Sequence, residues 1–358
     1  MKVRFIRNLL LGVILVLGAV SCVHEFPDET EPAEVVLKLE FNIDIDVNVE
    51  MNMNTEINTG LNPSTKTLTS ETHDIRYIVK FYRFMNGELV PKSVYEHTFT
   101  VDDINIHEFE ENLEIAEGQY RIFVWGDYLE QGSVEDHHYI TTDFPLITLN
   151  LPESGTYEGS QESRDAYIGY SDIEVVRRAA SEDPITADIN IHRPLGKFVI
   201  ISEDLDEFMT KITQQNLAET KAVDLSEYSV KIFYQGDEST IYNAPITFDA
   251  FIDKPVATFP GLNFTSKIVE VYNSETGKTE AQLGFDYVFV NGSETHTRIV
   301  VAVYDKNGEQ VAMTKSMKIP LKRNQVTYVR GGFLMENTKG GVAINPGFSG
   351  PDFTYIII

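Results

Sequence analysis

The sequence has one cysteine in 358 residues, Cys22, so no disulfide can form within the chain. It has one tryptophan, Trp125, and no stretch after residue 22 approaches the run of about 18 apolar residues expected of a membrane-spanning helix. Lys and Arg number 29 against 55 Asp and Glu, and the formal charge of −26 makes nucleic acid an unfavourable partner. The fold must therefore be held by a hydrophobic core, which 42% hydrophobic residues can supply.

Motifs that carry chemistry are also missing. The eight histidines form no HExxH or other metal-ligand spacing, and the chain has no glycine-rich phosphate loop and no GxSxG. EDHHY (135–139) is interpreted as a polar loop, because a zinc site needs three or four converging ligands. DKNGE (305–309) lacks the spacing of a calcium loop and is predicted to be a hairpin turn. We therefore predict a protein that is not an enzyme and has no catalytic, cofactor or metal site.

The first 21 residues are predicted to be an export signal. Lys2, Arg4 and Arg7 precede the apolar run LLLGVILVLGAV (9–20), which is too short to span a bilayer. Removing residues 1–21, which carry these three basic residues and no acidic one, leaves 337 residues with a formal charge of −29. At about 150 residues per domain, this length suggests two domains.

The residues around Cys22 resemble the lipobox of bacterial lipoproteins, in which the cysteine becomes the lipidated first residue of the mature chain. AVSC departs from the usual pattern at Ala19, where that motif has Leu. The resemblance implies lipid attachment at Cys22, and the alternative is a free thiol in a secreted protein. Residues 22–34 are predicted to be a flexible tether, because VHEFPDETEPAE (23–34) is acidic, contains two prolines and has no hydrophobic period.

The next stretch alternates strictly for longer than ordinary strands do. Every odd-numbered residue from Val35 to Met53 is apolar, and every even-numbered residue from Lys38 to Asn54 is charged or Asn. This period of two predicts a strand with one polar and one apolar face. Ordinary strands contain about five or six residues, so the length of this run needs a functional explanation.

Short β-like runs separated by turn residues dominate the rest of the chain. Regular short strands of this kind favour β-sandwiches. The predicted strands are 75–84, 94–101, 119–128, 144–151, 165–176, 188–202, 227–236, 255–262, 281–290, 297–305, 310–321 and 325–333. Trp125 lies within an apolar run and is predicted to be a core residue.

One helix is predicted, at 202–219. Ser202 is its expected N-cap, and apolar residues at helical spacing from Leu205 to Ile212 form its buried stripe.

RRAASEDPITA (177–187) has no hydrophobic period and contains a proline, so we place a domain boundary there. This gives an N-terminal β-sandwich at 35–180 and a C-terminal β-sandwich at 181–358.

Several stretches together resemble the fimbrillin-type surface lipoproteins of Bacteroidales, in particular the minor anchor or accessory subunits of their type V pili. The resembling stretches are YRIFVWGDY (120–128), TTDFPLITL (141–149), RDAYIGYSDIEV (164–175), HRPLGKFVIISEDLDEF (192–208), KIPLKRNQVTYVRGGFL (318–334) and GGVAINPGFSGPDF (340–353). They form a pattern of structural residues from about residue 75 to the end. The resemblance implies an all-β fold of two tandem transthyretin-like β-sandwiches, with the one short helix in the second.

The resemblance also suggests how the opening strand is used. Subunits of this family assemble by strand exchange, and an arginine-specific protease first removes the opening strand of stalk subunits. This chain has no arginine between Cys22 and Arg76, so such a cut has no site there. We therefore expect the chain to keep its first strand and its lipid, as an anchor or accessory subunit would.

The resulting hypothesis is a non-enzymatic lipoprotein of the outer membrane, exposed at the cell surface, that anchors or limits a type V pilus and contributes to cell adhesion. Its expected partners are pilus stalk subunits, bound by strand addition, and the membrane, bound through the lipid at Cys22. No nucleic acid or small-molecule substrate is expected. The alternative is a cell-surface lipoprotein that binds glycan or host protein.

The C-terminal stretch GGVAINPGFSGPDFTYIII (340–358) ends in uncharged, strongly apolar residues. It has two interpretations: a final strand within the second sandwich, or a strand that also contacts the next pilus subunit.

Overall fold

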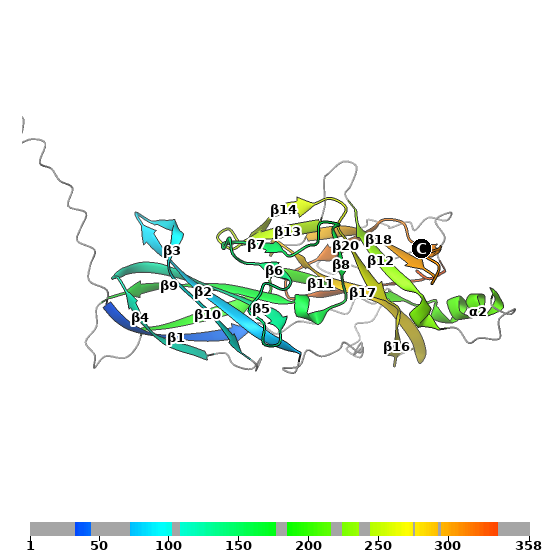
Figure 1. The fold of residues 1–358 in the computed structure, drawn as a ribbon, viewed down its shortest axis with the longest axis horizontal. Coiled ribbons are helices and arrows are strands. Elements are labelled where there is room, and N and C mark those ends of the chain that lie inside the picture. Colours follow the sequence, from blue (N-terminus) through cyan, green and yellow to red (C-terminus); the bar gives the residue numbers. More distant parts are fainter. Residues whose placement is uncertain are drawn as a thin grey trace, which may run out of the picture.

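A computed structural model describes residues 33–43, 72–101, 108–176, 185–215, 224–235, 244–274, 276–292 and 295–335. Strands dominate these ranges, and α2 (Leu205–Gln215) is the α-helix among them (Figure 1). A seven-stranded sheet occupies one end of an elongated molecule, and the other sheets and α2 extend to the other end (Figure 1). The all-β prediction is confirmed, whereas the assignment to tandem transthyretin-like sandwiches stays a prediction.

The first sheet has seven strands in the order β3-β2-β5-β9-β10-β1-β4. Its strands are β1 (Ala33–Ile43), β2 (His73–Met85), β3 (Glu88–Val101), β4 (Glu108–Ile115), β5 (Gly118–Glu130), β9 (Ala166–Val175) and β10 (Ile185–His192). Neighbours are antiparallel except β1 and β10, which run parallel. The β2–β3 hairpin turns at Asn86 and Gly87, both with the positive φ that an Asn-Gly turn of this kind requires.

This sheet turns a corner where β9 meets β10, because these strands pair over only two residue positions. A Cβ atom at Gly169 would lie 2.4 Å from the carbonyl oxygen of Asn190, so glycine permits the close approach. Beyond the corner, Ile189 of β10 shares a buried core with Val79 of β2 and Ile122 of β5. The two parts of the sheet therefore face each other as the layers of a sandwich.

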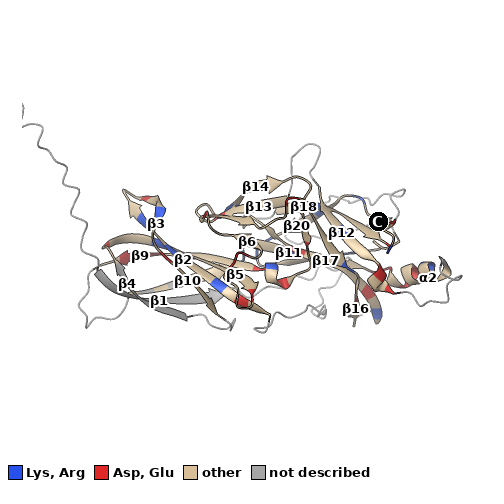
Figure 2. Cartoon of the chain, viewed as in Figure 1, with Lys and Arg blue, Asp and Glu red and all other residues tan. Residues whose placement is uncertain are grey.

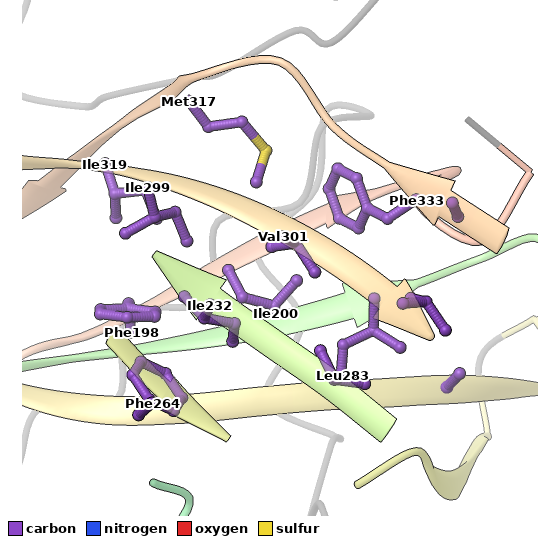
Figure 3. Close-up of a cluster of buried hydrophobic side chains, with 14 of the residues drawn as sticks. Phe198, Ile200, Ile232, Phe264, Leu283, Ile299, Val301, Met317, Ile319 and Phe333 are labelled. Atoms are coloured by element: carbon purple, nitrogen blue, oxygen red, sulfur yellow. The ribbon is translucent and has the colours of Figure 1, made fainter. Parts of the chain in front are cut away.

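Two more sheets form the other end of the molecule. One has the order β19-β18-β12-β15-β8, with β20 also paired to β18, and the other has the order β16-β17-β11-β21. Their strands are β8 (Thr156–Glu158), β11 (Leu195–Ser202), β12 (Ser229–Tyr234), β15 (Asn263–Lys267), β16 (Val269–Asn273), β17 (Lys278–Phe289), β18 (Thr295–Tyr304), β19 (Gln310–Met313), β20 (Met317–Leu321) and β21 (Val326–Gly331). Buried side chains of Phe198, Ile232, Phe264, Leu283 and Val301 fill the space between these sheets (Figure 3).

α2 packs on this core through one face. Leu205, Phe208 and Ile212 are buried at the spacing of successive helical turns, which confirms the predicted stripe. Asp206 and Glu207 occupy the first turn, where the helix dipole favours negative charge (Figure 2).

The prediction that Ser202 caps α2 is wrong, because pairing with β17 and β21 extends β11 through Ser202. Its hydroxyl instead accepts hydrogen bonds from the backbone N–H groups of Phe333 (2.9 Å) and Leu334 (3.2 Å) and donates one to Asp204 (2.6 Å). The Asp204 carboxylate also accepts the N–H of Met335 at 2.8 Å. These bonds hold residues 333–335 beside the start of α2.

A small sheet with the order β14-β13-β7-β6 joins residues from before and after the predicted boundary. Its strands are β6 (Tyr139–Ile140), β7 (Leu146–Leu149), β13 (Ala244–Asp249) and β14 (Lys254–Phe259). Strand pairing crosses residue 180 elsewhere too, because β8 pairs with β15 and β10 belongs to the first sheet. The division into 35–180 and 181–358 stays a prediction, and the sheets do not divide at that point.

A shared core links the first sheet to the rest of the molecule. Trp125 is fully buried there, with its ring 5.4 Å from that of Tyr139, so its predicted core role is confirmed. Phe251, just after β13, reaches the first sheet, and its ring lies 4.8 Å from the Tyr82 ring in an edge-on arrangement.

Candidate functional site

β1 is an interior strand of the first sheet. It pairs with β10 from Leu37 to Ile43 and with β4 from Ala33 to Glu40, so both of its edges are hydrogen bonded. This confirms the opening run as an integral strand up to Ile43, and its predicted continuation at 44–53 lies outside the described residues. Loss of a strand in this position would open the sheet between β4 and β10.

Several predicted features lie outside the described residues, namely Cys22, the signal at 1–21 and the C-terminal stretch at 340–358. β1 already includes Ala33 and Glu34, the last two residues of the predicted tether. Within the described ranges, no helix is both long and apolar enough to cross a membrane.

A buried ion pair attaches the segment after β8 to the second end of the molecule. Arg164, in the 3-10 helix η1 (Glu162–Arg164), has a side chain 2% exposed, and its Nε donates to Oδ1 of Asp286 at 2.9 Å. The hydroxyls of Tyr157 and Tyr234 both donate to Oδ2, the latter at 2.5 Å. The Arg164 guanidinium also lies 4.3 Å from the centre of the Tyr157 ring. Asp286 is thus held by three donors from three elements.

The electrostatics of this cluster indicate a structural role. Burial raises the pKa values of Tyr157 and Tyr234 well above their usual range, and the Asp286 charge adds to the effect. Burial acts to lower the pKa of Arg164, but the Asp286 charge and the nearby tyrosine hydroxyls together outweigh it, and the pKa is raised. The tyrosines therefore stay neutral and Arg164 stays charged at pH 7, which leaves no group poised to exchange a proton.

Two further ion pairs lie close by in the sequence. Lys197 Nζ is 2.7 Å from Oε1 of Glu162, and Arg193 Nε is 2.7 Å from Oδ2 of Asp165. Lys197 lies in β11 and Arg193 just before it, so η1 and its neighbours are attached to the start of β11 as well as to β17. The sequence analysis did not predict these ion pairs. The only sign of them in the sequence is that charged residues lie next to the apolar run of a predicted strand.

The EDHHY stretch (135–139) forms a loop up to His138, as predicted, but it is not simply polar. His138 is buried with its Nε2 2.9 Å from Oγ of Ser163, and burial lowers the pKa of His138 to about 2. Tyr139 belongs to β6, and its hydroxyl donates to the backbone oxygen of Arg164. In the part of the chain that the structure covers, no group of three His, Cys, Asp or Glu residues is placed to hold a metal ion.

DKNGE (305–309) forms the turn between β18 and β19, which confirms the predicted hairpin. The Asp305 carboxylate accepts the backbone N–H groups of Asn307 at 2.9 Å and Glu309 at 2.8 Å.

Exposed aromatic side chains are scattered rather than clustered. Among the residues described, the aromatic side chains that stand out as exposed are Tyr170 at 48% and Tyr272 at 66%. They lie in β9 and β16, which belong to different sheets, so they form no common stacking surface for a sugar. β3 and β4 are the edge strands of the first sheet, and β16 and β21 are those of the sheet that contains β11.

Solved structures similar to this one include fimbrial and adhesin proteins of Bacteroidales. A candidate adhesin of Bacteroides thetaiotaomicron has 10% identity and a TM-score of 0.43, with 84% of this chain and 92% of that chain covered. The fimbrial anchor protein of Porphyromonas gingivalis has 12% identity and a TM-score of 0.36, with 79% and 82% covered. A fimbrial assembly protein of Parabacteroides distasonis has 9% identity and a TM-score of 0.33, with 84% and 90% covered.

No curated protein matches the sequence. The model of a family of unknown function, DUF6562, matches residues 39–357, which is most of the chain. The protein therefore belongs to this family.

Proposed function

We propose that the protein is a non-enzymatic lipoprotein of the outer membrane that anchors or limits a type V pilus and so contributes to cell adhesion. Its partners are pilus stalk subunits, bound by strand addition, and the membrane, bound through a lipid at Cys22. The resemblance of its sequence to minor subunits of such pili supports this role.

The interior position of β1 is the observation that carries the proposal. Residues from Ala33 to Ile43 fill the place between β4 and β10, so the first sheet offers no empty site there for a strand from another subunit. The absence of arginine between Cys22 and Arg76 supports retention of this strand after export. A subunit that cannot accept a strand at this place terminates a pilus built by strand exchange. A lipid on its N-terminus would put that end of the pilus at the membrane.

Edge strands provide the surface through which such a subunit can bind the stalk. An edge strand presents unpaired N–H and C=O groups, and an extended segment of a partner can pair with them. β3 and β16 are such edges within the described sheets.

The test uses the bacterium that makes the protein. In cells that carry Cys22→Ala, pili should be shed into the medium, because the subunit at their base no longer holds the membrane. His24→Ala, a change two residues away in the predicted tether, is the matched control and should leave the pili on the cells. Pili that stay cell-bound in the Cys22→Ala strain would contradict the proposal.

The alternative, a surface module that binds glycan or host protein, is favoured by one feature, a cleft lined partly by η1.

A further inference from the structure

A cleft with a volume of about 990 Å³ lies beside the segment that carries the buried Arg164. Its walls come from 158–163, the start of β12, strand β15 and part of β17. Small-molecule sites have volumes of about 300–1,000 Å³, so the cleft is large enough for an extended ligand of several rings.

Gln282 provides an amide with unused hydrogen-bonding capacity in this cleft. It lies in β17, is 6% exposed and lines the cleft. Within the described residues, the amide of Gln282 makes no hydrogen bond, and its atoms are not among the side-chain atoms that are buried without a partner. The amide therefore offers two donor hydrogens and an acceptor oxygen to a ligand in the cleft.

Several of the side chains that line the cleft carry hydroxyl groups. Ser160 and Ser266 share a hydrogen bond of 2.7 Å between their Oγ atoms, and Thr265 and Ser229 are exposed beside them. Ser160 is held at φ 59°, a conformation that few residues other than glycine, Asn and Asp adopt. Its Oγ also accepts the N–H of Phe285 at 3.1 Å, which stabilises this unusual backbone and fixes the hydroxyl at the cleft.

The charges around the cleft exclude several kinds of ligand. Its lining includes four acidic side chains and two lysines, and these lysines are Lys267 and Lys306. Lys306 is already paired with Glu227 at 3.2 Å, so the net field disfavours phosphate, sulfate and acidic sugars. The acidic groups in the described residues include no set of three placed to hold a metal ion. With anions and metal ions disfavoured, the ligand that suits this lining is neutral and rich in hydrogen-bond donors and acceptors.

We propose that this cleft binds a neutral oligosaccharide, with the amide of Gln282 and the hydroxyls of Ser160, Ser229 and Thr265 bonding to its hydroxyl groups. Each of these side chains can donate and accept, which matches the alternating demands of sugar hydroxyls. The carboxylates at the rim accept further hydrogen bonds from them. This binding site goes beyond the proposed pilus function and does not depend on it.

The test measures binding of four neutral hexasaccharides, cellohexaose, xylohexaose, mannohexaose and chitohexaose, by titration calorimetry with the full mature chain. At least one should bind with a dissociation constant below about 1 mM, and a heparin hexasaccharide should not bind. Gln282→Leu keeps the side-chain size but removes the amide, and Thr265→Trp fills the cleft from an exposed position. Each should weaken binding by about tenfold or more.

The matched control is Thr258→Trp, which places the same bulky side chain at an exposed position of β14 outside the cleft and should bind like the native protein. Melting temperatures of all variants confirm that they fold. The proposal is overturned if none of the four sugars binds, if the heparin fragment binds in their place, or if Gln282→Leu and Thr265→Trp bind as tightly as Thr258→Trp. Cells with Thr265→Trp should still retain their pili, so the two functions are tested separately.

Discussion

Replacing Arg164 with methionine should lower the free energy of unfolding by about 3–5 kcal/mol, the usual cost of leaving a buried charge without its partner. The side chains of Arg164 and Asp286 are 2% and 1% exposed, so water cannot take the place of the lost guanidinium. The hydroxyls of Tyr157 and Tyr234 would still donate to the Asp286 carboxylate, which keeps the cost within this range rather than above it.

A double-mutant cycle separates the ion pair from the loss of packing. Asp286→Leu alone should also be strongly destabilising, because it leaves Arg164 buried and unpaired. The double variant carries neither charge, so its cost should fall short of the sum of the single costs by about 1–3 kcal/mol. Arg121 and Asp172 supply the control, since they form a two-bond pair at 2.6 and 2.7 Å but are 23% and 51% exposed. Arg121→Met should cost no more than about 1 kcal/mol.

Urea unfolding followed by tryptophan fluorescence measures these differences. Trp125 is the sole tryptophan and lies in the core that links the first sheet to the rest of the molecule, so its emission reports loss of that core. If Arg164→Met costs no more than Arg121→Met, or if the double variant costs the full sum, the buried pair does not attach the segment after β8 to β17 as described.

Three further changes test other parts of the structure. Phe41→Asp should cost several kcal/mol in urea unfolding, because it interrupts the apolar row of an interior strand, whereas Asn42→Lys on the polar row of the same strand should have almost no effect. Equal costs would contradict the strand assignment. The pKa of His138 is about 2 in the fold against about 6.5 in the unfolded chain, so protons bind the unfolded state first and stability falls by about 1.4 kcal/mol for each pH unit below 6.5. Between pH 7 and pH 5, His138→Gln should therefore lose about 2 kcal/mol less than the native protein, and an equal loss would show that His138 does not remain neutral. Truncation after Asn345 should destabilise the second end of the molecule if the final strand packs there, or leave a folded protein that no longer retains pili if that strand contacts the next subunit. A folded truncated protein with unaltered pilus attachment would exclude both interpretations.

Features that depend on neighbours in the sequence were predictable. The alternation that begins at Val35 identified β1, and the residues of DKNGE (305–309) located the β18–β19 turn. The apolar stripe from Leu205 identified α2, and the apolar surroundings of Trp125 indicated its burial. In each case the signal and the structure it specifies lie within one strand, helix or turn.

Features that depend on distant partners were not predictable. Arg164 and Asp286 are 122 residues apart, and nothing near either residue indicates that the two side chains are buried against each other. The run 188–202 was predicted as one strand, but it covers most of β10 and all of β11, which belong to different sheets. Pro194 lies between the two strands. The N-cap assigned to Ser202 failed for the same reason, because pairing with β17 and β21 extends the strand through that residue.

Strands without a strong period were missed altogether. The alternation of β4 (Glu108–Ile115) is short, and Glu111 interrupts its apolar row. β13 (Ala244–Asp249) has a proline at its second position, so neither strand has the long alternation of β1. Both form because a neighbouring strand supplies hydrogen bonds, β1 for β4 and β7 for β13. Such strands are specified by the sheet rather than by their own residues.

The central claim is that the exported protein keeps both its lipid and its first strand. Intact mass spectrometry of the protein purified from the outer membrane tests it most directly. The account predicts a mature chain that begins at Cys22, carries covalent acyl chains and includes β1 (Ala33–Ile43). A chain that begins after Ile43, or one that begins at Cys22 without a lipid, would contradict it.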